Sequence, residues 1–156
     1  MSEENGTVTG EKDVELFDLD GTLDEVEAAP EFVMPANGHH VFGVVACKIK
    51  DAKRINITYK LKETLEQTDA DELATEPGSL CSEGWQATKT GLEYFKTRAI
   101  QLLGKETCAG QSVTAIVAML DSDEYQQAYD FTAVTKLAKS GEYENLRFSK
   151  VALRTI

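Results

Sequence analysis

The stretch from Arg54 to Leu65, RINITYKLKETL, alternates strictly between apolar and polar side chains. One face carries Ile55, Ile57, Tyr59 and Leu61, and the other carries Asn56, Thr58, Lys60 and Lys62. A period of two is typical of a β-strand with one buried face. The preceding run, HHVFGVVACKIK (39–50), is apolar and β-branched, and only residues 51–53 separate the two runs. The sequence therefore predicts an antiparallel hairpin with Tyr59 and Phe42 in the core.

Downstream of this hairpin the pattern predicts one helix and further strands. Residues 66–87 are acidic and loop-like. From Thr88 to Gly104 the apolar residues recur at helical spacing, and Gly104 suits the end of a helix. Apolar runs predict strands over 111–120, 126–136 and 143–156. We therefore expect a mainly β fold with one helix, built from antiparallel strand pairs.

Charge is distributed unevenly along the 156 residues, whose net charge is −11. Residues 1–31 hold eleven acidic side chains and one base, whereas the remaining sixteen acids and fifteen bases nearly cancel. We divide the chain into an acidic, partly disordered N-terminal arm, residues 1–35, and one folded domain, residues 36–156. The sequence shows no signal peptide and no apolar run of the roughly 20 residues that cross a bilayer, so we expect a cytoplasmic protein.

The cations of the folded domain are concentrated on the predicted hairpin. Only Asp51 opposes a basic set that consists of Lys48, Lys50, Lys53, Arg54, Lys60 and Lys62. The next stretch, Glu63–Glu83, holds seven acids and no base. Six cations on one hairpin could follow the phosphates of a nucleic-acid strand. The alternative is a solvated hairpin whose edge lysines prevent aggregation.

Aromatic side chains that could stack on bases are fewer. Trp85 lies in a polar segment just before the predicted helix, and it is either an anchor beneath that segment or a stacking surface. Tyr94, Lys96 and Arg98 could line the outer side of the helix, where a solvated face is the alternative.

The sequence offers little support for metal or redox chemistry. The three cysteines form no C-x-x-C pair and are expected to be reduced, partly buried thiols. His39 and His40 are adjacent in a predicted strand, so they point in opposite directions and cannot easily share one ion. We expect no metal site and no cofactor.

The N-terminal arm contains LFDLDGTL (16–23), which resembles the nucleophile motif of haloacid-dehalogenase-type phosphatases. The resemblance implies that Asp18 attacks phosphorus, that Asp20 handles the leaving-group proton and that Mg²⁺ neutralises the charge. Asp121-x-Asp123 imitates the late acidic pair of that family. That fold needs strands alternating with helices in a parallel sheet, whereas this chain predicts antiparallel pairs. We interpret the motif as part of an acidic arm with apolar anchors, with a Mg²⁺-dependent phosphohydrolase as the alternative.

From Pro35 to Lys139 the chain resembles a group of small phage proteins in its layout and in short phrases. The matching phrases read PANGHHVFGVVACKIK, RINITYKLK, FKTRAIQLLG and AGQSVTAIVAM. The resemblance implies an oligonucleotide/oligosaccharide-binding (OB) fold, a partly open antiparallel β-barrel that binds single-stranded DNA in phage replication or recombination. The chain departs from that group in its short DAKR turn and in the acidic segment 63–83.

These observations predict a phage-type single-stranded DNA-binding protein of the host cytoplasm, without enzymatic activity and able to form homo-oligomers. The acidic arm would cover the basic hairpin as a phosphate mimic or dock a replication or recombination protein. Deletion of residues 1–31 should then tighten binding to DNA. A protein-interaction or virion-associated β domain, in which the basic hairpin is only surface, is the remaining alternative.

Overall fold

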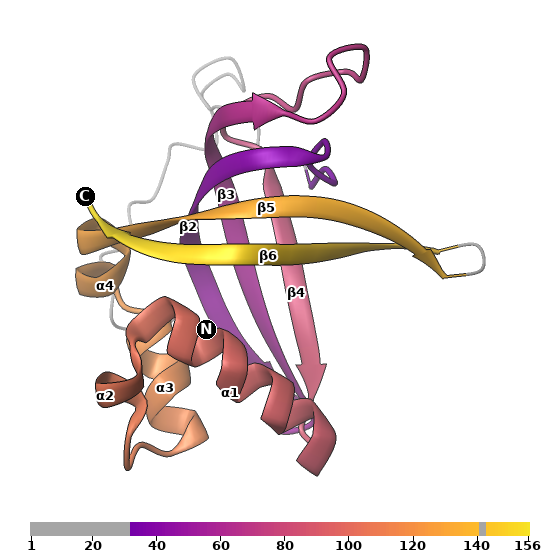
Figure 1. The fold of residues 1–156 in the computed structure, drawn as a ribbon. Coiled ribbons are helices and arrows are strands. Elements are labelled where there is room, and N and C mark those ends of the chain that lie inside the picture. The colour runs from indigo at the N-terminus through magenta and orange to yellow at the C-terminus, as the bar shows by residue number, and fades with distance from the viewer. Residues whose placement is uncertain (1–31, 141–142) are drawn as a thin grey trace, which may run out of the picture.

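The computed structural model of the protein describes residues 32–140 and 143–156 (Figure 1). Most of the predicted arm, with Asp18 and Asp20, lies outside the described residues. The elements are β2 (Gly38–Lys50), β3 (Arg54–Gln67), β4 (Leu80–Gln86), α1 (Lys89–Leu103), α2 (Lys105–Cys108), α3 (Val113–Leu120), α4 (Asp123–Ala128), β5 (Tyr129–Ser140) and β6 (Tyr143–Thr155). Within this part of the chain no helix is long and apolar enough to cross a membrane.

The strands form one antiparallel sheet of five in the order β4-β3-β2-β5-β6. The predicted hairpin is confirmed, since β2 pairs with β3 from Gly38↔Gln67 to Lys50↔Arg54. β2, β3 and β4 follow one another, and β5 returns after the helices to lie beside β2, which is a Greek-key arrangement. The edges β4 and β6 do not pair, so the sheet is open and is not a closed barrel.

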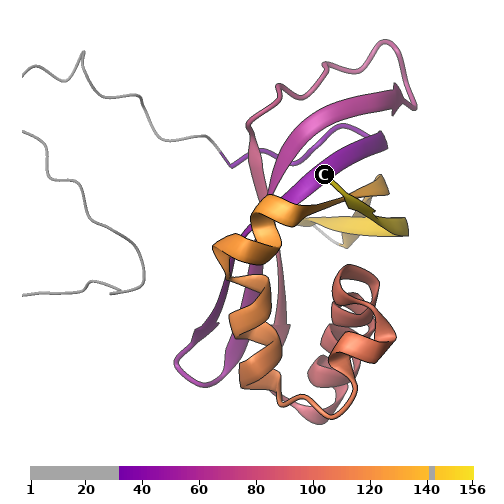
Figure 2. The same cartoon turned by 90° about the vertical axis from the view of Figure 1, so that its left-hand side faces the viewer.

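The sheet is strongly curved, and the helices pack against it to enclose the hydrophobic core. In Figure 1, β5 and β6 cross steeply over the other three strands, and Figure 2 shows α1 and α3 below them. α3 packs against β2, and α1 packs against β4 and β6. The largest side chains buried in this core are Phe42, Ile55, Ile57, Tyr59, Leu61, Phe95, Leu102, Leu120 and Phe131. The predicted core positions of Tyr59 and Phe42 are confirmed.

The predicted helix from Thr88 to Gly104 is confirmed as α1, but the strand predicted over 111–120 is wrong. Most of that run forms the helix α3, whose first turn is capped where the Ala115 N–H donates to the Ser112 hydroxyl at 3.1 Å. Its buried residues are Ile116, Val117 and Leu120, which is the spacing of a helical face. A short run that is apolar at nearly every position has neither period, so its pattern does not separate a strand from a buried helix.

Two further boundaries differ from the predicted ones, and the fold has four described helices instead of one. The predicted strand 126–136 begins as α4, which Ser122 caps, and β5 starts only at Tyr129. The predicted loop 66–87 contains the edge strand β4, which pairs with β3 from Arg54↔Gln86 to Lys60↔Leu80. The sequence of β4, LCSEGWQ, lacks clear alternation, and in the fold this strand is stabilised by pairing with β3 and by packing of α1.

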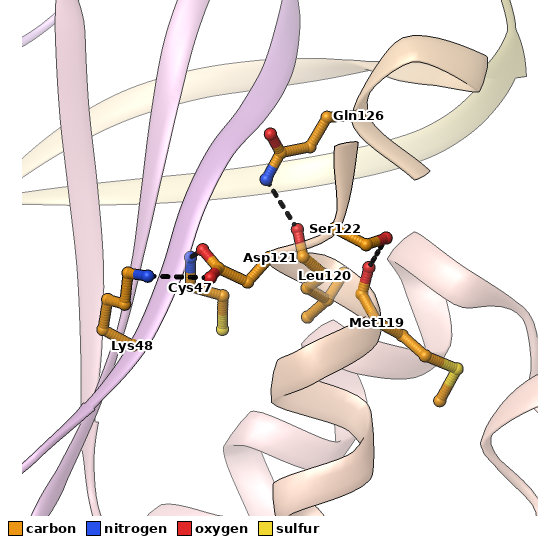
Figure 3. A network of polar contacts seen from close by, with 7 residues as sticks. All are labelled: Cys47, Lys48, Met119, Leu120, Asp121, Ser122 and Gln126. Carbon is orange, nitrogen blue, oxygen red and sulfur yellow. Dashed lines mark hydrogen bonds and ion pairs between the residues drawn. The ribbon is translucent and has the colours of Figure 1, made fainter. Parts of the chain in front are cut away.

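The residue that follows α3, Asp121, fastens this helix to a free edge of the sheet (Figure 3). β5 pairs with β2 only as far as Phe42, so the rest of that edge has no strand beside it. The Cys47 N–H donates to Asp121 Oδ1 at 2.9 Å, and Lys48 Nζ donates to Asp121 Oδ2 at 2.8 Å. Asp121, one half of the predicted acidic pair, thus completes the hydrogen bonding of a sheet edge.

We expect Asp121→Ala to lower the free energy of unfolding by on the order of 1 kcal/mol, because the Cys47 N–H then loses its protein acceptor. Asp121→Asn keeps an acceptor oxygen and removes only a partly exposed ion pair, so it should lose less than half as much. Urea denaturation of the two variants measures the difference. Equal losses of unfolding free energy in the two variants would show that the charge of Asp121, and not its hydrogen bond to the Cys47 N–H, stabilises the contact between α3 and β2.

The entry of the chain into the sheet depends on the buried imidazole of His40. Its Nε2–H donates to the Ala36 carbonyl at 2.7 Å, and Nδ1 lies 2.9 Å from the Thr64 hydroxyl, which donates to it in this tautomer. The pKa of His40 is lowered, chiefly by burial and further by His39, against the opposing effects of the Ala36 hydrogen bond and of Glu72. The folded state therefore holds His40 neutral.

Because the folded pKa of His40 lies below the unfolded value near 6.5, the unfolded chain binds the extra proton between these two values. We expect this contribution to the free energy of unfolding to be complete at pH values well above 6.5 and to be lost as the pH falls through 6.5 toward the lower folded pKa. Denaturation midpoints at several pH values measure the slope. His40→Gln should flatten the slope, and an unchanged slope in that variant would refute the assignment.

Candidate nucleic-acid interface

The tight turn between β4 and α1 brings two groups of predicted site residues together. Thr88 caps α1 by accepting a hydrogen bond from the Gly91 N–H at 3.1 Å. A Cβ atom on Gly91 would overlap the Gln86 carbonyl oxygen, so only glycine allows the helix to start this close to the strand. Tyr94 and Arg98 of α1 consequently lie beside Trp85 of β4.

These residues line a pocket of about 350 Å³ between β4, α1 and β6. We call it the aromatic pocket, and its lining residues are Glu83, Trp85, Tyr94, Thr97, Arg98, Gln101, Arg147 and Phe148. Tyr94 is 68% exposed, which is unusual for so large a ring. The indole of Trp85 is half-buried and packs edge-to-face on Phe95, with ring centroids 5.5 Å apart. The pocket thus contains one exposed ring, that of Tyr94, and one ring held in place by packing, that of Trp85.

A buried charge network forms the floor of the aromatic pocket. Arg98 Nε and Nη2 donate to the two carboxylate oxygens of Glu83, each at 2.9 Å, and each of these side chains is only 12% exposed. The hydroxyl of Tyr59 donates to Glu83 Oε1 at 2.6 Å. Burial, followed by the charge of Glu83, raises the pKa of Tyr59 well above its ordinary value, so the phenol stays protonated.

This network changes the role expected for Arg98. The guanidinium also donates to Gln101 and lies over the Phe148 ring, 5.3 Å from its centroid. Each of its three nitrogens donates within the protein and its charge is paired with Glu83, so we assign Arg98 to holding the pocket together and not to neutralising a phosphate. Arg147, which is exposed at the rim, is the cation of the pocket that can.

The six hairpin cations do not form one continuous surface. Lys48 pairs with Asp121, and Lys62 Nζ lies 3.7 Å from Asp130 Oδ2. Lys50, Lys53 and Lys60 are exposed, as is Arg54, whose Nε donates to Asn56 at 3.1 Å. Lys60 and Arg54 alternate with the buried Ile55, Ile57 and Tyr59, so they occupy the sheet face opposite the aromatic pocket.

The hairpin turn nevertheless approaches the base of α1. The Ala87 N–H donates to the Lys53 carbonyl at 2.8 Å. A second hollow of about 420 Å³ lies there, lined by Ala52, Lys53, Arg54, Gln86, Ala87 and Thr88. Lys53 and Arg54 thus adjoin the residues that follow Trp85, whereas Lys96 lies on a different side of α1, in a separate groove.

Sequence reasoning missed Arg147 and Phe148, although both fall in the strand that it predicts over 143–156. Surfaces that bind single strands combine cations with aromatic rings, and this strand offers one of each in Arg147 and Phe148. Their position beside Trp85 could not be inferred, because β4 and β6 are the opposite edges of the sheet and meet through α1, which packs against both.

The phosphohydrolase alternative finds no matching fold here. Its Asp18 and Asp20 lie outside the described residues, and the five strands are antiparallel where that fold requires a parallel sheet. Among residues 32–140 and 143–156 no three His, Cys, Asp or Glu side chains gather as metal ligands. Cys47, Cys81 and Cys108 are free and buried, and burial raises the pKa of the first two thiols to about 12.

Comparison with known proteins gives no match, whether with a family model, a curated protein or a solved structure.

Proposed function

We propose that this protein binds single-stranded DNA, as in phage replication or recombination, and that the aromatic pocket is where the bases stack. The supporting observation is that Tyr94, exposed over two thirds of its surface, lies beside Trp85, Phe148 and Arg147 in one hollow. Proteins that bind single strands combine aromatic platforms for bases with cations for phosphates. A pocket of this size accommodates one base with its sugar, and the rim arginine is placed for the adjoining phosphate.

The fold also supports this function. An OB fold is a five-stranded, partly open Greek-key barrel, whose second and third strands and neighbouring loops bind oligonucleotides. Here five strands form an open Greek key, with β3 and β4 as the second and third. We infer an OB-like fold in which α1 fills the gap between the edges β4 and β6. The turn that carries Lys50, Lys53 and Arg54 corresponds to the loop between the first two OB strands.

The charges predict a moderate dependence of binding on salt. With Lys48, Lys62 and Arg98 held in ion pairs, the exposed cations that remain are Arg147 at the pocket, Lys53 and Arg54 at the neighbouring hollow, and Lys50 at the end of β2. If a strand contacts about two to four of them, the logarithm of the affinity should fall with the logarithm of salt with a slope of about −1.5 to −3. Base stacking must then supply much of the affinity of a chain whose net charge is −11.

Titration of the full chain with oligothymidylate at two salt concentrations tests the proposal. Trp85 is the only tryptophan, so quenching of its fluorescence reports stacking at the pocket itself. We expect saturable quenching by single strands and weaker quenching by duplex DNA of the same length. A flat signal combined with no binding in filter or anisotropy assays would refute DNA binding and favour a protein-interaction domain.

A further inference from the structure

An apolar groove of about 640 Å³ lies between α1 and the α2–α3 segment, apart from the aromatic pocket. Its floor is formed by Leu92, Phe95, Ile100, Val113 and Ile116. Three lysines, Lys89, Lys96 and Lys105, stand along it against a single acid, Glu93. We call it the helical groove. Its chemistry suits a segment that carries both apolar and acidic side chains.

Such a segment exists in the same chain, outside the described residues. Residues 14–20 read VELFDLD, in which four apolar side chains, Val14, Leu16, Phe17 and Leu19, are interspersed with three carboxylates, Glu15, Asp18 and Asp20. Residues 1–31 contain one base against eleven acids, so the arm and the lysines of the groove are complementary in charge. This is also the part of the LFDLDGTL motif for which the proposed DNA binding has no role.

The length of the arm allows the segment to reach the groove. The Val33 N–H donates to the Leu80 carbonyl at 2.9 Å, so the arm leaves the domain at the start of β4. The groove begins at Lys89, one short strand away, or roughly 20–25 Å at about 3.3 Å per residue. The residues from Asp20 to Phe32 can span up to about 40 Å. Attachment through such a linker gives the segment an effective concentration near the millimolar range.

We propose that residues 14–20 dock in the helical groove of their own chain, with apolar side chains of the segment in contact with its floor and its carboxylates near Lys89, Lys96 and Lys105. This differs from a polyanion lying over the basic hairpin, because the outer face of β3 offers polar residues where Leu16 and Phe17 need apolar ones. It is also independent of DNA binding, since none of the groove residues lines the aromatic pocket.

Zero-length carbodiimide cross-linking of the full chain, read by peptide mass spectrometry, tests the docking. We expect Glu15, Asp18 or Asp20 to join Lys89, Lys96 or Lys105 within the monomer. The links should persist at about 0.5 M salt, where the screening length is only about 4 Å, because apolar contacts hold the segment. Links to Lys50, Lys53 or Lys60 instead, or no links at all, would overturn the proposal. Links found only in covalent dimers would assign the groove to the arm of a second copy.

A matched pair of variants tests the apolar part. Leu16→Ser with Phe17→Ser leaves every charge in place but removes two apolar side chains, and it should cut the groove links by about tenfold or more. Leu23→Ser with Val26→Ser also replaces two apolar side chains, but outside residues 14–20, and it should leave the yield of groove cross-links unchanged. Cross-links that survive Leu16→Ser with Phe17→Ser would show that charge alone attracts the segment. Equal losses in both double variants would show that residues 14–20 are not the part of the arm that docks.

Discussion

Replacing Arg98 with leucine should lower the free energy of unfolding by about 3–5 kcal/mol, the cost of removing one partner of a buried ion pair. Glu83 would keep its charge in a site that is only 12% exposed. The guanidinium also supports Gln101 and the Phe148 ring, so the variant loses packing between α1 and β6. Urea denaturation followed by far-ultraviolet circular dichroism measures the effect.

A second substitution separates charge from packing in this prediction. Glu83→Gln removes the carboxylate charge that Arg98→Leu leaves unpaired, but it keeps an oxygen that can accept from the Tyr59 hydroxyl. We expect Arg98→Leu combined with Glu83→Gln to recover at least about half of the loss, because the desolvation cost of the carboxylate then disappears. If Arg98→Leu alone lowers the free energy of unfolding by less than about 1 kcal/mol, water reaches the ion pair and the pair does not stabilise the base of the pocket.

Replacing Tyr94 with alanine should weaken oligothymidylate binding by about 5- to 150-fold and leave stability nearly unchanged. Stacking of one base on an aromatic ring contributes about 1–3 kcal/mol, whereas a ring that is 68% exposed contributes little to folding. Fluorescence anisotropy with a labelled oligonucleotide measures the affinity, and a denaturation curve checks that the fold is intact.

Tyr129→Ala is the matched control for this prediction. Tyr129 is also partly exposed, at 36%, but it stacks on Tyr125 near α4, away from the aromatic pocket. Its loss should leave the affinity for DNA within about twofold, the spread usual for a surface substitution. If the two variants bind alike, Tyr94 is only an exposed surface ring and the aromatic pocket is not the site.

The sequence predicts the parts of this fold that have a clear local period. The β2–β3 hairpin follows from the alternation around Tyr59, and α1 follows from its apolar spacing and from Gly104, whose φ of 92° suits a C-terminal glycine. α3 could not be predicted in this way, because its apolar run has no period, and β4 depends on a strand that precedes it in the chain. For α3 the Ser112 cap was the one local signal.

The candidate site was accessible to sequence reasoning only in part. The sequence presents Trp85 and the helix residues Tyr94 and Arg98 as separate candidates, and the structure brings them together because Gly91 permits a tight turn. The partner of Lys48 is 73 residues distant in sequence, so no local pattern could show that this lysine is occupied. For the same reason the helical pattern predicts Arg98 as a surface cation, because its partner Glu83 lies 15 residues earlier in another element.

Photocross-linking of the full chain to an oligothymidylate that carries 5-iodouracil tests most directly whether bases stack in the aromatic pocket. The activated base joins to aromatic rings that it touches, and peptide mass spectrometry identifies them. We predict adducts on Tyr94, Trp85 or Phe148. Adducts confined to peptides outside the pocket, or a chain that binds the oligonucleotide with none of these three rings modified, would contradict the account.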